Sequence, residues 1–195
     1  MNHRVRHIHR AVLACGAAVA GQGRGGLHGL QVSTPDLPPV EHHWTPDVRR
    51  DTYSVSKSFV AIAIGIAQDA GLLELSDPLS RHLGHLAPYA APGVESITIK
   101  QLLTMTSGII YRWDEERIKA LDDPAAAVVG ATLGFAPGSG FAYRGADTYL
   151  LSRIIHACSG EDLRDFLVSR LFEPLGISTP EWQRCPRGFS LGAVG

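Results

Sequence analysis

One serine in the chain stands three residues before a lysine, a spacing that can turn a serine hydroxyl into a nucleophile. Ser54 precedes Lys57 in the stretch S-V-S-K, so on a helix both side chains lie on one face, one turn apart. A serine hydroxyl is a weak nucleophile until a neighbouring group takes its proton, and a lysine kept neutral by burial can do so. Lys100 and Lys119 have no serine at that spacing. The pair therefore predicts nucleophilic chemistry at Ser54.

The residues that follow the pair favour chemistry over coincidence. By itself, the spacing occurs by chance in about one chain in five of this composition, and the alternative is a helix-start serine with a solvated lysine. Residues 58–67, S-F-V-A-I-A-I-G-I-A, are apolar on all sides, which predicts a helix buried by its neighbours. Lys57 would then enter that buried helix, whose first backbone N–H groups can stabilise an oxyanion.

The elements that must position this pair are mostly helices. The helix after Lys57 should end near Ala70, because Gly71 can adopt the left-handed cap conformation. Thr98 and Gln101 form a capping box that opens a second helix. The turn P-G-S-G leads into an extended segment that ends at Tyr143. Three further helices are predicted, beginning at Asp123-Pro124, spanning residues 148–158 and spanning residues 161–172.

Residues 1–50 differ in character from residues 51–195, which we expect to form one domain. Arg4, Arg6 and Arg10 precede a short apolar stretch that ends in A-V-A, the layout of a signal peptide. The alternative is that residues 8–19 form strands of the domain, which their alanine-rich and weakly apolar character favours. Residues 21–50 are rich in Gly and Pro and predict a loop with one short strand. The localisation therefore stays open between cytoplasmic and periplasmic or secreted.

Composition and charge exclude several classes of function. The net charge of −1 gives no reason to expect a nucleic-acid partner, and no apolar run reaches the length of a bilayer span. The histidines and the three cysteines follow no metal-ligand or disulfide-framework spacing. We therefore predict no metal and no cofactor, and the oligomeric state stays open.

Four segments, taken in order, resemble the class C β-lactamase and penicillin-binding esterase family. They are D-T-Y-S-V-S-K-S-F-V, T-I-K-Q-L-L-T-M-T-S-G-I, P-G-S-G-F-A-Y-R-G, and Y-L-L-S-R-I-I-H through L-F-E-P-L-G-I. The resemblance runs from Asp51 to Ile177. It implies an α/β (α+β) fold of the β-lactamase/transpeptidase-like kind, an antiparallel sheet flanked by helices. It also implies acyl-enzyme chemistry on amides or esters.

The resemblance assigns roles to particular residues. Ser54 matches the nucleophile, Lys57 its activating partner, and Tyr143 the tyrosine that carries protons to and from the leaving group. Without the family context, Tyr143 would be interpreted as a buried aromatic residue with a hydrogen-bonded hydroxyl. The family usually carries Asn or Ser two residues after the tyrosine, whereas this chain has Arg144 and then Gly145, our candidate substrate-binding position.

A later family motif, K-T-G or H-x-G on a strand, is absent, because no lysine follows Lys119 and His156 begins H-A-C. We therefore expect the helical region to be largely present and the C-terminal strands to be missing, which makes the chain a poor and marginally stable catalyst by itself. The predicted function is a serine hydrolase that cleaves a small-molecule β-lactam, short ester or peptide-like amide. The alternative is a non-catalytic remnant that acts as a binding protein.

A second serine motif competes with the first. Residues 188–192, G-F-S-L-G, fit the nucleophile elbow of α/β-hydrolases. That motif needs a preceding strand, a following helix and a downstream acid and histidine. Only three residues follow Gly192 and none of them is Asp, Glu or His. We interpret the match as a coincidence within a glycine-rich turn.

Overall fold

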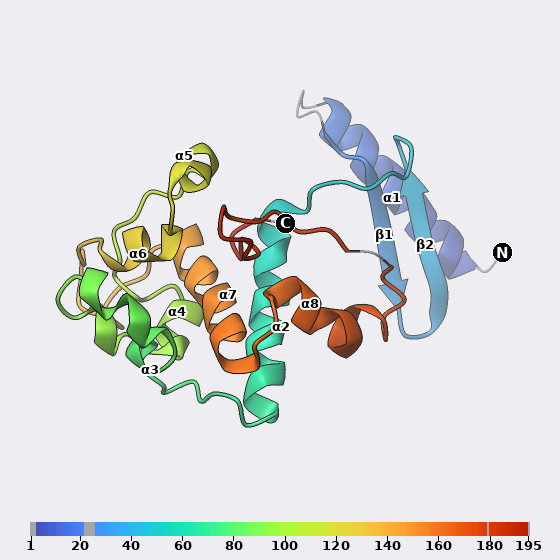
Figure 1. The fold of residues 1–195 in the computed structure, drawn as a ribbon. Helices are drawn as coiled ribbons and strands as arrows, with labels where there is room; N and C mark the ends of the chain where they lie inside the picture. Colours follow the sequence, from blue (N-terminus) through green and yellow to red (C-terminus); the bar gives the residue numbers. More distant parts are fainter. Residues whose placement is uncertain (1–2, 22–25, 179, 195) are drawn as a thin grey trace. The chain divides into compact units, whose positions relative to one another are not determined.

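The computed structural model describes residues 3–21, 26–178 and 180–194, and the chain forms two compact units, residues 1–50 and 51–195. Figure 1 shows the first unit in blue as one helix and a β-hairpin, and the second as a group of helices. Each unit is described by itself below. The two strands of the hairpin are the only β-strands longer than an isolated bridge in the described part of the chain.

The N-terminal unit packs helix α1 (His3–Gly21) on the hairpin of β1 (Gly29–Thr34) and β2 (Leu37–His43). The strands are antiparallel and pair Val32 with Val40. A Cβ atom at Gly16 would lie 2.0 Å from the Trp44 ring, so only glycine allows this close approach. Helix and hairpin are therefore held together by side-chain packing.

The prediction of strands over residues 8–19 is wrong, because these residues belong to α1. Their alanines have the highest helix propensity of any residue and suit a strand poorly. Val12, 2% exposed, supplies the buried contact of the helix. Residues 21–50 also contain two strands where we expected one, and residues 22–25 of that segment lie outside the described part of the chain.

Helix α7 (Gly145–Ser159) lies at the centre of the second unit. Ten consecutive residues, 146–155, are buried, so neighbours cover the helix on every side. Those neighbours include α2 (Ser56–Asp69), α3 (Leu79–Leu83), α4 (Ile99–Leu103) and α6 (Pro124–Val129). Figure 1 shows α2 and α7 side by side.

Helix α2 carries the predicted nucleophile region at its beginning and ends where the sequence predicts. Gly71 has φ of 71°, and its N–H donates to the carbonyl of Gln68 at 2.8 Å. The expectation that this helix is buried on all sides holds for one face only. Val60, Ala63, Ile64 and Ala67 are buried, whereas Ile62 is 42% exposed.

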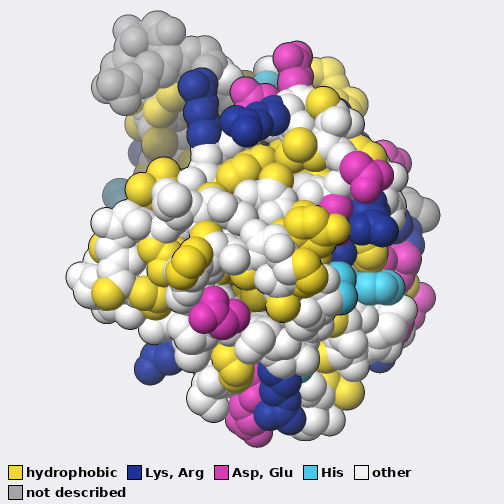
Figure 2. Space-filling view, turned by 60° about the vertical axis from the view of Figure 1, so that its left-hand side comes forward, with side chains coloured by type: hydrophobic (Ala, Val, Ile, Leu, Met, Phe, Trp, Pro, Cys, Tyr) yellow, Lys and Arg dark blue, Asp and Glu magenta, His cyan; other side chains and the backbone are white. Residues whose placement is uncertain are grey.

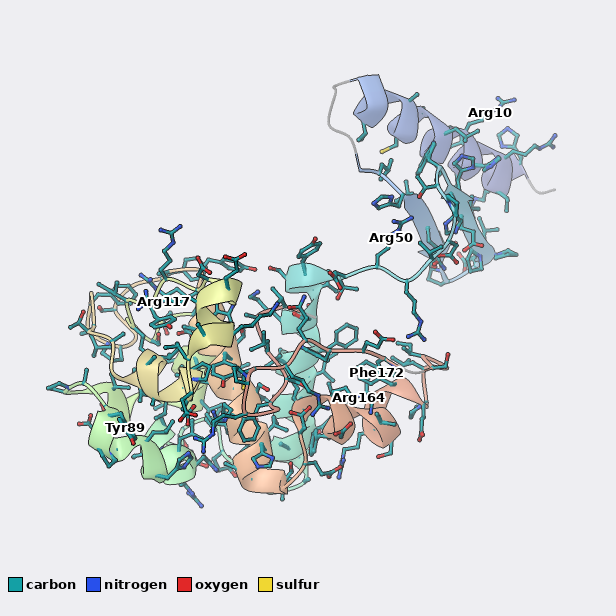
Figure 3. The ribbon with its side chains drawn as sticks, turned by 45° about the horizontal axis from the view of Figure 1, so that its top comes forward. Arg10, Arg50, Tyr89, Arg117, Arg164 and Phe172 are labelled. Atoms are coloured by element: carbon teal, nitrogen blue, oxygen red, sulfur yellow. The ribbon has the colours of Figure 1, made fainter. Side chains whose placement is uncertain are left out.

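The remaining helices begin at polar caps that the sequence indicates in part. Asp123 caps α6 by accepting from the N–H of Ala125, as expected for D-P. The unit also contains the short helices α5 (Glu115–Ala120) and α8 (Leu163–Leu167), the latter continuing into a π-helical turn, Val168–Phe172. Two 3-10 helices, Gly84–Tyr89 and Val94–Ser96, lie between α3 and α4. Phe172, labelled in Figure 3, packs against Phe59 of α2 with ring centroids 5.4 Å apart.

On the face drawn in Figure 2, neither positively nor negatively charged side chains gather into a large patch. Basic and acidic side chains lie interspersed among apolar ones there, in keeping with a net charge of −1. Within the described residues, none of the helices combines the length and the apolar character that crossing a bilayer requires.

Thr98→Ala should lower the free energy of unfolding by about 1 kcal/mol, because it removes the hydroxyl that accepts from the N–H of Gln101. The reciprocal bond from the Gln101 side chain to the Thr98 N–H completes the predicted capping box, which the structure confirms. Urea titration measures the change. Thr98→Ser keeps the acceptor and should stay close to the wild type, and an equal loss in both variants would assign the effect to the methyl group.

Candidate active site

Ser54 and Lys57 meet at the start of α2. Ser54 lies in a short 3-10 helix, Tyr53–Val55, directly before α2, and Lys57 is the second residue of α2. The Lys57 Nζ lies 3.1 Å from the Ser54 Oγ, at hydrogen-bond distance. Tyr53 has φ of 48°, a left-handed conformation that is costly for a residue with a side chain. Local backbone strain thus accompanies the turn that presents the serine.

The lysine amine also donates a hydrogen bond to a backbone carbonyl near the C-terminal end of the sequence. Lys57 Nζ donates to the carbonyl oxygen of Ala193 at 2.5 Å, across 136 positions of sequence. Figure 1 shows the red C-terminal segment beside the beginning of α2. The amine is therefore held between a backbone carbonyl and the Ser54 hydroxyl.

Tyr143 joins this pair. Lys57 Nζ lies 5.3 Å from the centroid of the Tyr143 ring. A hydrogen bond with Ser54, and then the positive charge of Lys57, lower the pKa of the Tyr143 hydroxyl below its ordinary value, although partial burial opposes this. A phenol with a lowered pKa gives up its proton more readily than an ordinary tyrosine. The side chain is 61% exposed, so the buried-aromatic interpretation does not describe it.

The segment before Tyr143 is hydrogen-bonded to the loop after α4. The N–H of Ala142 donates to the carbonyl of Met105 at 3.0 Å. A Cβ atom at Gly108 would lie 2.3 Å from the Phe135 carbonyl oxygen, so the close approach of these two segments requires glycine at 108. This hydrogen bond and the close approach at Gly108 fix the segment that leads to Tyr143.

The two residues after Tyr143 depart from the family and sit in close packing. A Cβ atom at Gly145 would lie 2.9 Å from both the Ala193 Cβ and the Trp113 ring, which leaves no room for the usual Asn or Ser side chain. Gly145 therefore has a packing role whatever its contact with a substrate. The Nε atom of Arg144 is buried and finds no hydrogen-bond partner among the described residues.

A buried carboxyl group lies on the first turn of α7. Asp147 is fully buried, and the hydroxyl of Ser107 donates to its Oδ1 at 2.8 Å. Its Oδ2 has no hydrogen-bond partner among the described residues. Burial raises the pKa of Asp147 to about 7, against the opposing effects of the Ser107 hydrogen bond and the Arg144 charge. This carboxyl therefore gains or loses its proton near neutral pH.

The competing serine, Ser190, is fully buried and is not presented like a nucleophile. Its hydroxyl donates to Asp162 Oδ2 at 2.5 Å, and turns flank the motif where an elbow needs a strand and a helix. Within the described residues there is also no group of three or more His, Cys, Asp or Glu side chains arranged to hold a metal ion.

Sequence reasoning identified the three side chains that meet here, but missed the groups that support them. The Ala193 carbonyl belongs to the backbone, so no residue type signals it. Asp147 and Ser107, whose side chains pair in the interior, were not singled out by sequence reasoning either.

Comparison with known proteins gives the family to which the sequence is similar. Residues 5–194 match the sequence profile of the β-lactamase family. Protein flp of Staphylococcus aureus (strain COL) is 32% identical over 139 residues, which cover 69% of this chain and 28% of flp. Penicillin-binding protein 4* of Bacillus subtilis (strain 168) is 30% identical over 134 residues, covering 64% of this chain and 28% of that protein. The chain thus spans about three tenths of the curated relatives it matches.

A solved structure shows the same fold. The crystal structure of a class C β-lactamase in complex with cefoxitin superposes with a TM-score of 0.74 at 16% identity. The match covers 98% of this chain and 61% of that one. This likeness confirms the predicted fold class.

Asp147→Asn should make stability less dependent on pH. Folding raises the pKa of this acid to about 7, so its contribution to stability is fully present below its unfolded pKa near 4 and is lost as the pH rises through 7. Thermal unfolding between pH 4 and pH 8 should show the wild type losing, relative to the variant, on the order of 4 kcal/mol.

The exposed Asp69, at the end of α2, supplies the control. Asp69→Asn makes the same chemical change at an exposed position, so comparison of the two variants isolates the effect of burial. If Asp147→Asn parallels the wild type across the whole range, proton binding by Asp147 does not change on folding and its burial has no such effect.

Proposed function

Because the chain belongs to the β-lactamase family, a family of serine hydrolases, we propose that it forms an acyl-enzyme on Ser54. One observation carries the proposal: the Ser54 hydroxyl lies 3.1 Å from the Lys57 amine, and Tyr143 contacts the same pair. A nucleophile within hydrogen-bond reach of a base, with a third group beside them, is the arrangement that nucleophilic catalysis requires.

Acylation begins with transfer of the Ser54 proton to the neutral amine of Lys57. The serine Oγ then forms a bond to the carbonyl carbon of the substrate, and the carbonyl electron pair moves to its oxygen. When the tetrahedral intermediate collapses, the bond to the leaving nitrogen or oxygen breaks. Tyr143 hands a proton to that leaving group and regains one from the Lys57 ammonium, so the protons balance.

Deacylation uses the same residues in reverse. A water molecule gives a proton to the Tyr143–Lys57 pair while its oxygen attacks the acyl carbon. The proton then returns to the Ser54 oxygen as the ester bond breaks, which releases a carboxylic acid and restores the enzyme. The lowered pKa of Tyr143 makes it a better proton donor to the leaving group than an ordinary phenol.

The proposed substrate is a small amide or ester: a β-lactam, a short-chain ester or a peptide-like amide. One relative is a penicillin-binding protein and one structural neighbour holds cefoxitin, which supports this class without choosing within it. Gly145 stays our candidate for a substrate-binding position, and it would act through its backbone because no side chain fits there. Arg144 brings a positive charge beside Tyr143 in place of a neutral side chain.

Ser54→Ala should abolish covalent labelling by a fluorescent penicillin or a fluorophosphonate, because it removes the attacking oxygen. Loss of a nucleophile in a cooperating site costs on the order of a millionfold in turnover. Mass spectrometry of the labelled peptide locates the adduct. Ser58→Ala is the matched control, since Ser58 is exposed and follows Lys57 directly, and it should label like the wild type. An adduct on Ser56, Ser58 or Ser190 would contradict the assignment.

Labelling of Ser54 without turnover would instead favour a binding protein that retains the family's site. Hydrolysis of a chromogenic cephalosporin and of a short-chain ester, measured on the same preparation, separates these two functions.

Tyr143→Phe should slow turnover by about 10²–10⁴-fold, the range typical of losing a general acid or base. The ring over Lys57 stays and only the hydroxyl is removed, so the change isolates proton transfer from packing. Steady-state kinetics with the same ester measures it. Tyr53→Phe removes another exposed hydroxyl next to Ser54 and should change the rate little. Equal effects of both variants would show that Tyr143 has no special part in the reaction.

A further inference from the structure

Every polar group of Ser190 is paired, although the residue is fully buried. Its hydroxyl donates to Asp162 Oδ2 at 2.5 Å, and its N–H donates to Asp162 Oδ1 at 2.8 Å. Its carbonyl accepts from the hydroxyl of Ser152 at 2.7 Å. Buried polar groups are tolerated when they are hydrogen-bonded, and full pairing fixes the backbone here in one place.

The partners of Ser190 belong to two helices that form part of the core. Ser152 lies in the buried middle of α7. Asp162 caps α8, where its side chain also accepts from the N–H of Arg164 at 3.3 Å. Arg184 lies 3.3 Å from Asp162 as an ion pair. Ser190 is thus tied between α7 and the start of α8.

The three residues after Ser190 lead directly to the carbonyl that contacts Lys57. Gly192 presses on α7, because a Cβ atom there would lie 2.2 Å from the Thr148 carbonyl oxygen. The Leu191 carbonyl accepts from the Trp182 indole N–H at 2.8 Å, and its N–H donates to the Gln183 carbonyl at 2.7 Å. These contacts of Leu191 and Gly192 set the direction of the carbonyl of the following residue, Ala193.

We propose that Asp162 and Ser190 are positioning residues for Lys57, holding the Ala193 carbonyl where it orients the lysine amine towards Ser54. The inference rests on the proposed function, in which Lys57 takes the serine proton. A neutral amine has two N–H bonds and one lone pair. Donating one N–H to a fixed carbonyl restricts rotation about Cε–Nζ and leaves the lone pair free to face the hydroxyl. The same carbonyl accepts from the ammonium that forms after proton transfer.

Two variants remove the same hydrogen bond from opposite ends. Ser190→Ala deletes the hydroxyl. Asp162→Asn leaves one acceptor oxygen where the carboxylate has two: Oδ2 accepts from the Ser190 hydroxyl and from the Arg164 N–H, and Oδ1 accepts from the Ser190 N–H. Asp165→Asn is the matched control. It makes the same chemical change in the same helix and loses a similar contact with Arg184, 3.5 Å away, but no hydrogen bond joins Asp165 to Ser190 in the described residues.

Two measurements on the full chain test the proposal. Hydrogen–deuterium exchange of residues 191–194 reports whether the segment is released. The rate at which a fluorophosphonate labels Ser54, followed from pH 5 to pH 10, reports the state of the lysine. Both variants should exchange faster there and label on the order of tenfold more slowly at neutral pH, since small misplacements of a catalytic group are costly. The double variant should be no slower than either single one.

The pH profile distinguishes positioning from simple loss of stability. Removing an acceptor from the ammonium favours the neutral amine, so half-maximal labelling should move to lower pH in both variants but not in Asp165→Asn. A purely structural defect would lower the labelled fraction equally at every pH. Unchanged exchange overturns the proposal, and so does faster exchange with an unchanged pH profile.

Failure of the proposed function gives a different result. If the wild type is not labelled at Ser54 at any pH, the acyl-enzyme proposal fails and the positioning role fails with it. The exchange measurement then shows by itself whether the Asp162–Ser190 contact anchors the segment.

Discussion

The hydrogen bonds of one amine join the two ends of the second unit of this protein. Lys57 Nζ reaches the Ser54 hydroxyl at 3.1 Å and the Ala193 carbonyl at 2.5 Å, and the ring of Tyr143 lies 5.3 Å away. Each contact comes from a different part of the chain: the turn before α2, the segment after α8, and the segment after α6 that contains Tyr143. The three contacts of this amine form together only when all three segments are correctly placed, because a partly buried amine without a hydrogen-bond partner is costly.

Carboxylate side chains at the beginnings of helices hold these segments in place. Asp123 caps α6 and also pairs with the buried Arg153 at 3.0 Å and with Arg187. Arg153 in turn stacks on Phe189, 3.9 Å from the ring centroid. Arg164, labelled in Figure 3, donates to the Pro180 carbonyl at 3.0 Å. The segment after α8 contains little regular structure, so these side chains, together with a few backbone hydrogen bonds such as that from the Leu191 N–H to the Gln183 carbonyl, determine its path.

Sequence reasoning succeeded where the signal is local and failed where it is not. The ends of α2, the capping box at Thr98 and the start of α6 at Asp123 follow from residue types within one turn. The residues brought together in the site were predicted from the order of family motifs, which encodes tertiary proximity indirectly. The α1 residues were mistaken for strands because a short alanine-rich stretch has no decisive period. The Ala193 carbonyl could not be predicted, since a backbone atom leaves no trace in residue type.

The separation of Lys57 and Ala193 by 136 positions has a consequence for the order of folding. Closing so long a loop costs chain entropy that only the intervening helices can reduce, by docking first and bringing the two ends near. The helical pairs with short connections can form early, and the lysine–carbonyl contact belongs among the last to form. A molecule in which this contact is made has therefore completed the packing between the two ends of the second unit, so the proposed arrangement around Lys57 is complete only in chains that have finished folding.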